Sequence, residues 1–471
     1  MRTIPPALAL LLFVQGCSGL PLELWHTEEL TEEFTVKRAD EVRTFEDYRR
    51  LEDRLFAELE EKVYAPTQTG PEHELIRFSA GSAADPRDDG PNWNRSFELN
   101  AETRVGGVLL LHGMSDSPYS LHALGESLHR NGYQVLGLRM PGHGTAPSGL
   151  KHITATDMVA VTRLGMNHLA TQLGDKPIHI VGYSTGAALA IDFALAAMDG
   201  DVSPVPASLV LISPAIRIHG AAALASFKDG LSVVPGLSRL AWLQILPEFD
   251  PYKYNSFATN AGDVVHQLTR SVDARVADRA RSASGSEVVL PPILAFKSTV
   301  DSTVTTEAVV DNLLAVLSPN RHELVLFDIN RFAAKSMLLT ADPGPLTNRL
   351  MADETLPFTV TLIVNENPSS TRVVARRKGP FSADMSIEQI DLAWPPGVAS
   401  LSHVALPIPP DDPLYGRRPP ANEDVLFLGE MAMQGELGLL KLTGEWLLRM
   451  RYNPFYDVLE RRVLEWFDQA N

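Results

Sequence analysis

Apolar residues near the start of the chain recur at helical spacing. They lie three or four positions apart among many charged residues, at Phe45, Tyr48, Leu51, Leu55, Leu59 and Val63. This spacing places them on one face, so the pattern predicts an amphipathic helix over Asp40–Val63. The polar face of that helix mixes both signs of charge and is not rich in Lys and Arg. This favours packing on the core over binding to a membrane surface.

Two stretches of alternating polarity follow this helix. Glu74–Ser79 and Arg95–Leu99 are joined by the turn-rich Gly81–Asn94. Alternation at period two on both sides of such a connection predicts an antiparallel pair of strands.

From Gly107 onward, short apolar runs alternate with helix-favouring segments. We predict strands at Val108–Leu111, Gln134–Arg139, Ile178–Val181, Ser208–Ser213, Ile293–Lys297 and Glu323–Phe327. Near-continuous apolar strands separated by helices are typical of a parallel sheet that helices cover on both faces. The predicted fold class is therefore α/β. In such a sheet, binding and catalytic groups gather beyond the carboxyl ends of the strands.

Two segments interrupt this alternation. Ile216–Pro291 is rich in Ala, Leu and aromatic residues, and we expect a mostly helical cap over the strand ends. Arg331–Leu401 is a second insertion with a predicted hairpin, in which strands at Phe358–Val364 and Thr371–Ala375 flank Asn365–Ser370. After it, Pro454–Phe467 has the apolar spacing of a closing helix.

The composition is that of a globular protein. The chain has 471 residues, of which 45% are hydrophobic and 21% charged. Its formal net charge is -17, with the acidic residues scattered along the chain, so nucleic acid is not an expected partner. The 13 histidines show neither H-E-x-x-H nor a paired Cys/His spacing. We therefore predict no metal and no cofactor.

Cys17 is the only cysteine in the chain, which excludes an internal disulfide. It follows Arg2 and the apolar run Ile4–Val14, which is too short to span a bilayer and is typical of a secretory signal. Val14–Cys17 resembles a bacterial lipobox, in which the leader is cut before the cysteine and the thiol carries a lipid. Ser18 fits sorting to the outer membrane of a Gram-negative cell. We expect an exported cell-envelope protein held at the membrane surface by acyl chains, with a plain secretory signal as the alternative.

The strongest chemical motif is a serine between two glycines. Ile178–Val181 meets Gly182-Tyr183-Ser184-Thr185-Gly186 and passes into the Ala-rich Ala187–Met198. Strand, tight turn and helix in that order form the setting of a nucleophile elbow. A Cβ at either glycine would collide with the strained turn, and Ser184 would stand clear of the sheet.

A serine hydroxyl needs a base, and the base needs an acid that orients it. Asp301 follows the strand Ile293–Lys297 and is the candidate acid, with a turn or helix-cap residue as the alternative. Only His322 and His403 come after Asp301. His322 opens a strand and would lie at the wrong end of the sheet, so His403 is the predicted base. An ordinary hydrogen-bonding histidine is the alternative for His403.

Acyl transfer also needs N–H groups that face the developing oxyanion. We predict that the backbone amides of Thr185 and Met114 supply them, the second from the loop after the first parallel strand. In the same loops His112 and His143 are interpreted as structural residues.

These motifs together resemble the α/β-hydrolase fold, within it the monoacylglycerol lipases, carboxylesterases and related serine hydrolases, including serine aminopeptidases. The resemblance rests on Leu111–Ser117, Arg139–Gly144, Gly182–Gly186 and the Asp301 segment. It implies a cap over the pocket and carboxylic ester substrates, often with a hydrophobic acyl chain. We therefore expect a serine ester hydrolase of the esterase or lipase type, acting on a small-molecule or lipid-like ester such as an acylglycerol.

Two other functions fit parts of the sequence. A serine aminopeptidase would need a carboxylate near the pocket to pair with the substrate's ammonium, and Glu248 and Asp250 in the cap are candidates. A surface pair exposed to solvent is the alternative interpretation of these two residues. A non-catalytic binding protein could also keep this fold, although it has no need of Ser184, Asp301 and His403 together.

These predictions divide the chain into seven parts. They are a leader (1–16), an N-terminal helix and strand pair (17–104), the first half of the core (105–215), the cap (216–291), the later core strands (292–330), the insertion (331–401), and the His403 loop with a closing helix (402–471).

Overall fold

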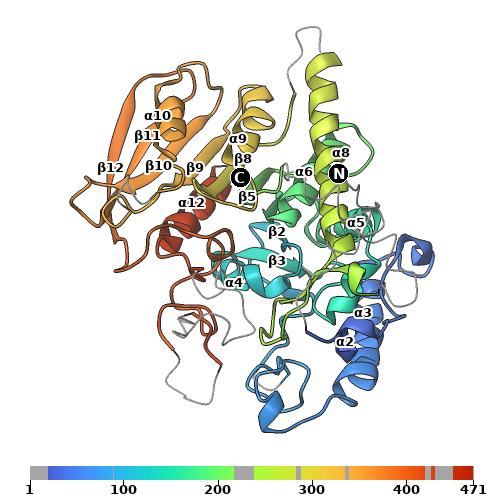
Figure 1. Ribbon diagram of the computed structural model, residues 1–471. Helices are drawn as coiled ribbons and strands as arrows, with labels where there is room; N and C mark the ends of the chain where they lie inside the picture. Colours follow the sequence, from blue (N-terminus) through green and yellow to red (C-terminus); the bar gives the residue numbers. More distant parts are fainter. Residues whose placement is uncertain are drawn as a thin grey trace, which may run out of the picture.

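The computed structural model describes residues 20–87, 90–216, 238–282, 288–334, 339–419, 426–429 and 449–469. Its centre is a ten-stranded sheet in the order β1-β3-β2-β4-β5-β8-β9-β10-β11-β12 (Figure 1). The strands are β1 (Phe97–Leu99), β2 (Gly106–Leu111), β3 (Tyr133–Leu138), β4 (Ile178–Tyr183), β5 (Ser208–Ile212), β8 (Ile293–Ser298), β9 (Glu323–Phe327), β10 (Thr359–Asn365), β11 (Arg372–Lys378) and β12 (Met385–Ala393). Neighbouring strands from β3 through β10 are parallel, whereas β1, β11 and β12 pair antiparallel. All six predicted core strands are present within two residues of their expected bounds.

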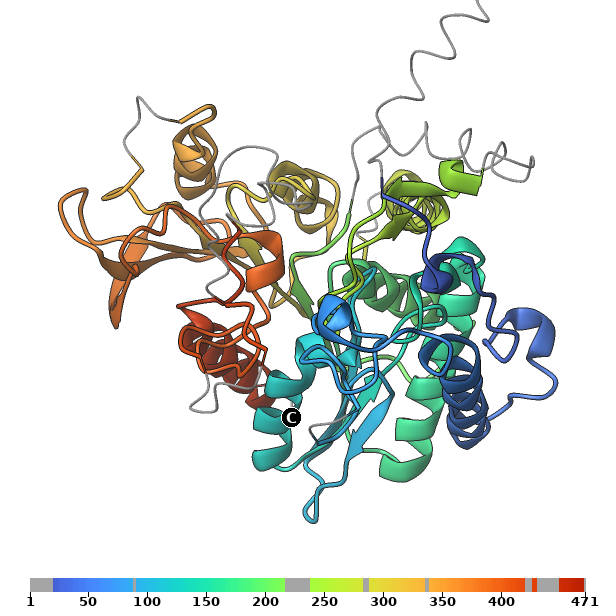
Figure 2. The ribbon, with the colours of Figure 1, turned by 60° about the horizontal axis from the view of Figure 1, so that its bottom comes forward.

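Helices cover both faces of the sheet. One face carries α5 (Ala155–Leu173), α6 (Thr185–Met198), α8 (Thr259–Ser282) and α9 (Thr306–Asp311), and the other carries α4 (His122–Arg130) and α12 (Tyr456–Asp468) (Figures 1 and 2). Successive residues of a strand point to opposite faces. In β2, Leu109 and Leu111 accordingly join one apolar cluster while Val108 and Leu110 join the other.

The N-terminal region packs on this core, as its apolar spacing predicts. Helix α3 (Phe45–Leu59) begins at a capping box between Thr44 and Asp47 and continues as a π-helical segment over Glu60–Tyr64. Its buried face joins the cluster under α5, and Tyr48 donates a hydrogen bond of 2.9 Å to the Arg139 carbonyl. The short α2 (Leu24–Thr27) lies on the same side of the molecule (Figure 2).

The predicted strand pair before the core is wrong. Glu74–Ser79 forms turns after a 3-10 helix at Pro71–His73, and β1 pairs antiparallel with β3 instead. Burial does not follow the alternation, because Leu75 is exposed whereas the consecutive residues Arg77 and Phe78 are both buried. The Arg77 backbone N–H donates to the Glu248 carbonyl at 2.8 Å, and its guanidinium lies over the Tyr254 ring. The segment therefore docks on the cap.

The insertion after β9 extends the main sheet. Strands β10 and β11 form the predicted antiparallel hairpin. Strand β10 is shifted by one residue, whereas β11 begins one residue later and ends three residues later than predicted. Strand β10 also pairs parallel with β9, and β12 adds a further edge strand. Apolar side chains on both faces of β10 explain this placement, because they need cover on both sides: Leu362 joins one apolar cluster and Ile363 the other. Helix α10 (Gly344–Ala352) packs against this part of the sheet.

The described part of the cap is helical only in part. It consists of a 3-10 helix at Ser238–Ala241, two short antiparallel strands, β6 (Trp242–Gln244) and β7 (Phe257–Ala258), and the long α8. The cap aromatics Trp242, Phe249 and Tyr254 are buried in apolar clusters, and Phe227 lies outside the described residues.

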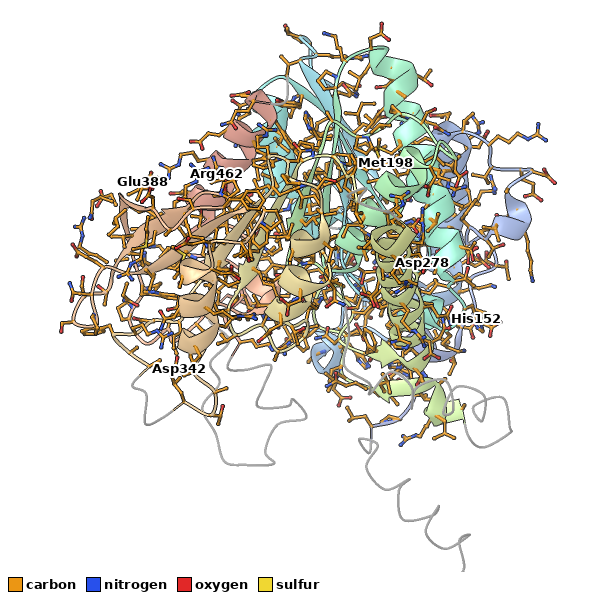
Figure 3. All side chains as sticks on the ribbon, turned by 90° about the horizontal axis from the view of Figure 1, so that it is seen from above. His152, Met198, Asp278, Asp342, Glu388 and Arg462 are labelled. Carbon is orange, nitrogen blue, oxygen red and sulfur yellow. The ribbon has the colours of Figure 1, made fainter. Side chains whose placement is uncertain are left out.

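The closing helix α12 lies where it was predicted. The helix is bound to the sheet by an ion pair, in which the Arg462 guanidinium lies 2.6 Å from the buried Glu323, the first residue of β9. Figure 3 shows Arg462 and Glu388 of β12 on one side of the molecule, with His152 and Asp278 on the other. In the part of the chain that is described, no helix is both long and apolar enough to cross a membrane.

Candidate active site

Ser184 occupies a strained turn between β4 and α6. Its backbone has φ 53° and ψ -113°, in the left-handed range that side chains other than glycine rarely adopt. A Cβ at Gly182 would lie 2.4 Å from the Gly186 carbonyl oxygen, and one at Gly186 would lie 2.0 Å from the Leu111 carbonyl oxygen. Both glycines are therefore required by close backbone contacts, and the elbow geometry agrees with the prediction. The serine side chain is half-buried at the carboxyl end of the central strand β4.

His403 and Asp301 form a hydrogen-bonded pair. His403 Nδ1 lies 2.8 Å from Asp301 Oδ2, and both side chains are almost completely buried. The His403 ring is also 5.5 Å from the ring of Tyr183, the residue that precedes Ser184. The structure thus brings the predicted acid and base together beside the elbow.

Two hydrogen bonds hold the segment between β12 and His403 against the core of the sheet. Ser298, the last residue of β8, donates its hydroxyl to the Leu401 carbonyl at 2.9 Å. Asn330, beyond the end of β9, donates its backbone N–H to the Ala399 carbonyl at 2.7 Å. The segment before His403 is thereby fixed across the carboxyl ends of two core strands.

Each oxygen of the Asp301 carboxylate accepts two hydrogen bonds. Oδ1 accepts the backbone N–H groups of Thr303 at 2.8 Å and Val304 at 3.2 Å. Oδ2 accepts from His403 and also from Lys297 Nζ at 2.7 Å. Burial by itself raises the pKa of Asp301, but His403 and the Lys297 ammonium outweigh burial and hold that pKa well below its usual range. The carboxylate therefore stays ionised across the neutral pH range.

The loop after β2 lies against the elbow. A Cβ at Gly113 would be 3.2 Å from Ser184 Cβ, so Met114 follows a residue in direct contact with the Ser184 turn. The cap holds this loop, because Tyr254 donates its backbone N–H to the Ser115 carbonyl at 2.8 Å. Thr185 is the first residue of α6, where the amide has no partner within the helix. The oxyanion role of the Met114 and Thr185 amides stays a prediction.

The other histidines of interest have structural contacts. His112 is buried, with Nδ1 2.8 Å from the Gly113 carbonyl, while Nε2 accepts the Met140 N–H at 3.0 Å. Burial holds the pKa of His112 well below its usual value, so the ring is neutral. His143 bonds to the Pro141 carbonyl at 2.9 Å. His322 accepts the Ile293 N–H at 3.1 Å, at the end of the sheet opposite to Ser184.

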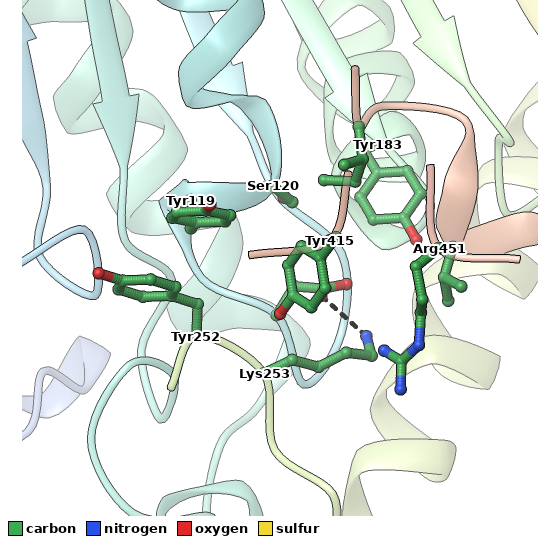
Figure 4. A pocket seen from close by; sticks show the side chains of 10 residues that line it. Tyr119, Ser120, Tyr183, Tyr252, Lys253, Tyr415 and Arg451 are labelled. Carbon is green, nitrogen blue, oxygen red and sulfur yellow. Dashed lines mark hydrogen bonds and ion pairs between the residues drawn. The ribbon is translucent and has the colours of Figure 1, made fainter. Parts of the chain in front are cut away.

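A small pocket lies beside the elbow (Figure 4), and the residues that line it were not predicted. Tyr183 and Val404, which adjoin Ser184 and His403 in the chain, line it together with Asp116, Tyr119, Ser120, Tyr252, Lys253, Ile408, Tyr415 and Arg451. Lys253 Nζ lies 2.8 Å from Asp116, and this ion pair is the dashed line in Figure 4. Tyr119 stacks on Tyr252 with ring centroids 4.1 Å apart. These contacts join residues more than a hundred positions apart, so no local pattern could have indicated them.

The two cap carboxylates considered for amine recognition are bound internally. Glu248 is fully buried and accepts the backbone N–H groups of Asn255 at 3.0 Å and Ser256 at 2.7 Å. Burial raises the pKa of Glu248 to about 7. Asp250 is also fully buried; it accepts the Tyr415 hydroxyl and two backbone N–H groups. The interpretation of these residues as a solvent-exposed surface pair is therefore wrong.

The predictions of a lipidated cysteine and of no metal site both involve residues that the structure does not describe. Cys17 lies outside the described residues. Among the described residues, no cluster of three or more His, Cys, Asp or Glu side chains could hold a metal ion.

Comparison with known proteins finds a family model that matches part of the core. Residues 103–273 match the family model described as serine aminopeptidase, S33. The matched range contains Ser184 and Met114 but ends before Asp301 and His403. With the parallel sheet and the elbow, this match identifies the core as an α/β-hydrolase fold.

The curated protein that the chain resembles is a lipase. Over 132 residues the chain is 30% identical to a thermostable monoacylglycerol lipase of Bacillus sp., a range that makes up 28% of this chain and 52% of the relative. The chain thus spans about half the length of this curated relative. A structure of metagenome-derived lipolytic enzymes covers 50% of this chain and 89% of its own at 21% identity and a TM-score of 0.40. The monoacylglycerol lipase of Paleococcus ferrophilus covers 50% and 88% at 19% identity and a TM-score of 0.38.

Proposed function

We propose that this chain, an α/β-hydrolase by its fold, is a serine hydrolase that cleaves carboxylic esters through an acyl-enzyme. The observation that carries the proposal is the pairing of His403 Nδ1 with Asp301 Oδ2 at 2.8 Å, beside the strained Ser184 turn. A strained serine at the end of the central strand, with a buried Asp–His pair next to it, has the parts that nucleophilic acyl transfer requires.

In the proposed mechanism, His403 takes the Ser184 hydroxyl proton as the oxygen attacks the ester carbonyl carbon. Asp301 holds the imidazole in the orientation that accepts this proton and stabilises the imidazolium that forms. The Thr185 and Met114 amides donate to the tetrahedral oxyanion. His403 then protonates the leaving alcohol, and an attacking water, deprotonated by the same imidazole, releases the acid.

Lipid-like esters, with acylglycerols as the first class to test, are the proposed substrates. The similarity to a monoacylglycerol lipase supports this class. The aromatic residues of the cap do not support this class further. Trp242 and Tyr254 pack in the core, and among the cap aromatics that the structure describes only Tyr252 lines the pocket beside Tyr183.

A peptidase activity is the second candidate, favoured by the name of the matching family model. Recognition of an N-terminal ammonium would need a carboxylate with oxygen atoms facing the substrate. Both oxygens of Glu248 already accept backbone N–H groups. Asp250 is fully buried, and its Oδ2 lies 3.7 Å from the Arg451 guanidinium. We therefore expect aryl esters to be hydrolysed much faster than aminoacyl-arylamides, and the reverse preference would favour the peptidase.

A fluorophosphonate probe tests the proposed chemistry against a binding role. An activated serine forms a covalent phosphonate, whereas an unactivated serine in the same fold does not react. We expect labelling at Ser184, located by mass spectrometry of the digested protein. A folded protein without label would indicate a non-catalytic α/β-hydrolase-fold protein.

We also propose that the protein is exported and lipidated at Cys17. The Val14–Cys17 motif supports this proposal. In a bacterial host, metabolic labelling with an alkynyl fatty acid should mark the wild type and not Cys17→Ala. Equal labelling of both proteins would contradict it.

A further inference from the structure

Lys297 is a buried lysine on a strand of the central sheet. It is the fifth residue of β8, and its side chain has no exposed surface. A buried ammonium is costly unless a partner of opposite charge and hydrogen-bond acceptors surround it. Its partner is Asp301, with Nζ 2.7 Å from Oδ2. The proposed function gives this lysine no task.

Lys297 and His403 donate to the same carboxylate oxygen. Oδ2 receives both, while the Thr303 and Val304 amides bind Oδ1. Rotation of the carboxylate would break contacts on both oxygens at once. The ammonium thus fixes the oxygen to which the imidazole Nδ1–H is directed, and its positive charge lies beside the place where the imidazolium forms.

We propose that Lys297 is a positioning residue for the acyl-transfer reaction, which orients Asp301 toward His403 and offsets part of the carboxylate charge. This inference rests on the proposed serine mechanism. It assigns Lys297 two effects: fixed geometry raises kcat, and the nearby cation makes protonation of the imidazole less favourable, so that activity extends to lower pH.

Other ionisable groups lie near Lys297 and Asp301, and replacement of Lys297 leaves them unchanged. Glu307 on α9 attracts the Lys297 ammonium, and Tyr183 at the end of β4 is close enough to Asp301 to interact with its charge. Burial lowers the pKa of Lys297, while Asp301 and Glu307 oppose that effect. A change that appears only when Lys297 is replaced therefore belongs to its own ammonium.

Lys297→Met removes the charge and keeps much of the volume. We expect kcat for a p-nitrophenyl ester to fall about tenfold, with KM changed less than twofold. The decrease is expected because the variant lacks one charge-assisted hydrogen bond that orients the base. We also expect the acidic limb of the kcat/KM profile to move up by about half a pH unit, because a cation beside the imidazole is gone.

Lys378→Met is the matched control. Lys378 is also a buried strand lysine, on β11, and it donates to the Asp353 carbonyl away from Ser184. A merely structural role for Lys297 predicts that both variants lose stability and that neither moves the acidic limb. That outcome would overturn the proposal.

A double-mutant cycle tests whether Lys297 acts through Asp301. In an Asp301→Asn background, Lys297→Met should reduce kcat less than twofold further, since the oriented carboxylate is already lost. A full additional tenfold loss would contradict the proposal. If Lys297→Met does not fold, Lys297→Gln, which keeps a donor without the charge, should still move the acidic limb, and an unmoved limb would overturn the charge effect.

Different results would refute the serine mechanism and the role of Lys297. Wild-type activity in Ser184→Ala would refute the serine mechanism itself. An inactive Ser184→Ala together with wild-type kinetics in Lys297→Met would refute only the role of Lys297.

Discussion

His403 follows Asp301 by 102 residues in the chain, yet its Nδ1 lies 2.8 Å from Asp301 Oδ2. The intervening segment adds β10, β11 and β12 to the sheet and then returns across the ends of β8 and β9. The strands that lengthen the sheet therefore also deliver the proposed base to the site.

Replacing the proposed acid should remove most of the activity. In Asp301→Asn the carboxylate is replaced by a neutral amide, so His403 Nδ1–H no longer donates to an anion. We therefore expect kcat to fall about 10³- to 10⁴-fold. The measurement is p-nitrophenyl ester hydrolysis by purified protein with an unchanged circular dichroism spectrum. Asp391→Asn, at a fully exposed position on β12, is the control and should retain wild-type kcat. A decrease of less than tenfold in Asp301→Asn would show that another group orients the base.

The second prediction concerns Gly186, two residues after the proposed nucleophile Ser184. A Cβ at Gly186 would lie 2.0 Å from the Leu111 carbonyl oxygen, which is backbone and must move. Gly186→Ala should therefore lower the free energy of unfolding by about 2 kcal/mol or more and displace Ser184. Chemical denaturation measures the first effect and ester hydrolysis the second.

Gly379→Ala is the control for that measurement. Its added Cβ would meet nothing within 4 Å, and its backbone is not left-handed. We expect a change within about 0.5 kcal/mol. Equal stability of the two variants would mean that the elbow is not tightly packed.

The third prediction is a pH dependence from Glu248. Burial raises its pKa from 4.5 to about 7, so the folded state binds a proton that the unfolded state releases in that range. Its contribution to stability is complete below pH 4.5 and is lost as the pH rises through 7. Between pH 5 and 8 the stability of the wild type relative to Glu248→Gln should fall by about 2 to 3 kcal/mol.

Thermal or urea unfolding at several pH values measures this difference. Glu388→Gln, at an exposed position, should show the same pH profile as the wild type. A constant difference between wild type and Glu248→Gln would mean that Glu248 titrates alike in both states.

The sequence allowed prediction of those parts of the fold that depend on local contacts. The elbow at Ser184 needs only a strand, two glycines and a helix, which are adjacent in the chain, so its geometry could be predicted. The core strands were found because strands buried on both faces are apolar at every position. His403 followed by elimination, since few histidines come after Asp301.

The remaining features depend on distant contacts. The alternation at Glu74–Ser79 indicated a strand, but Arg77 is buried against the cap. Lys297 stands as a lone charge at the end of an apolar run, a signal that could have been used, but its partner depends on how the loop after β8 folds back. The Asp116–Lys253 pair joins two loops that no pattern relates.

The hydrolysis of a short p-nitrophenyl ester by Ser184→Ala tests the central claim most directly. The side chain is half-buried and its removal leaves the turn backbone in place, so we expect the variant to fold like the wild type. Without the nucleophile, the account predicts that kcat falls by about 10³-fold or more. A folded Ser184→Ala that hydrolyses the ester at the wild-type rate would contradict it.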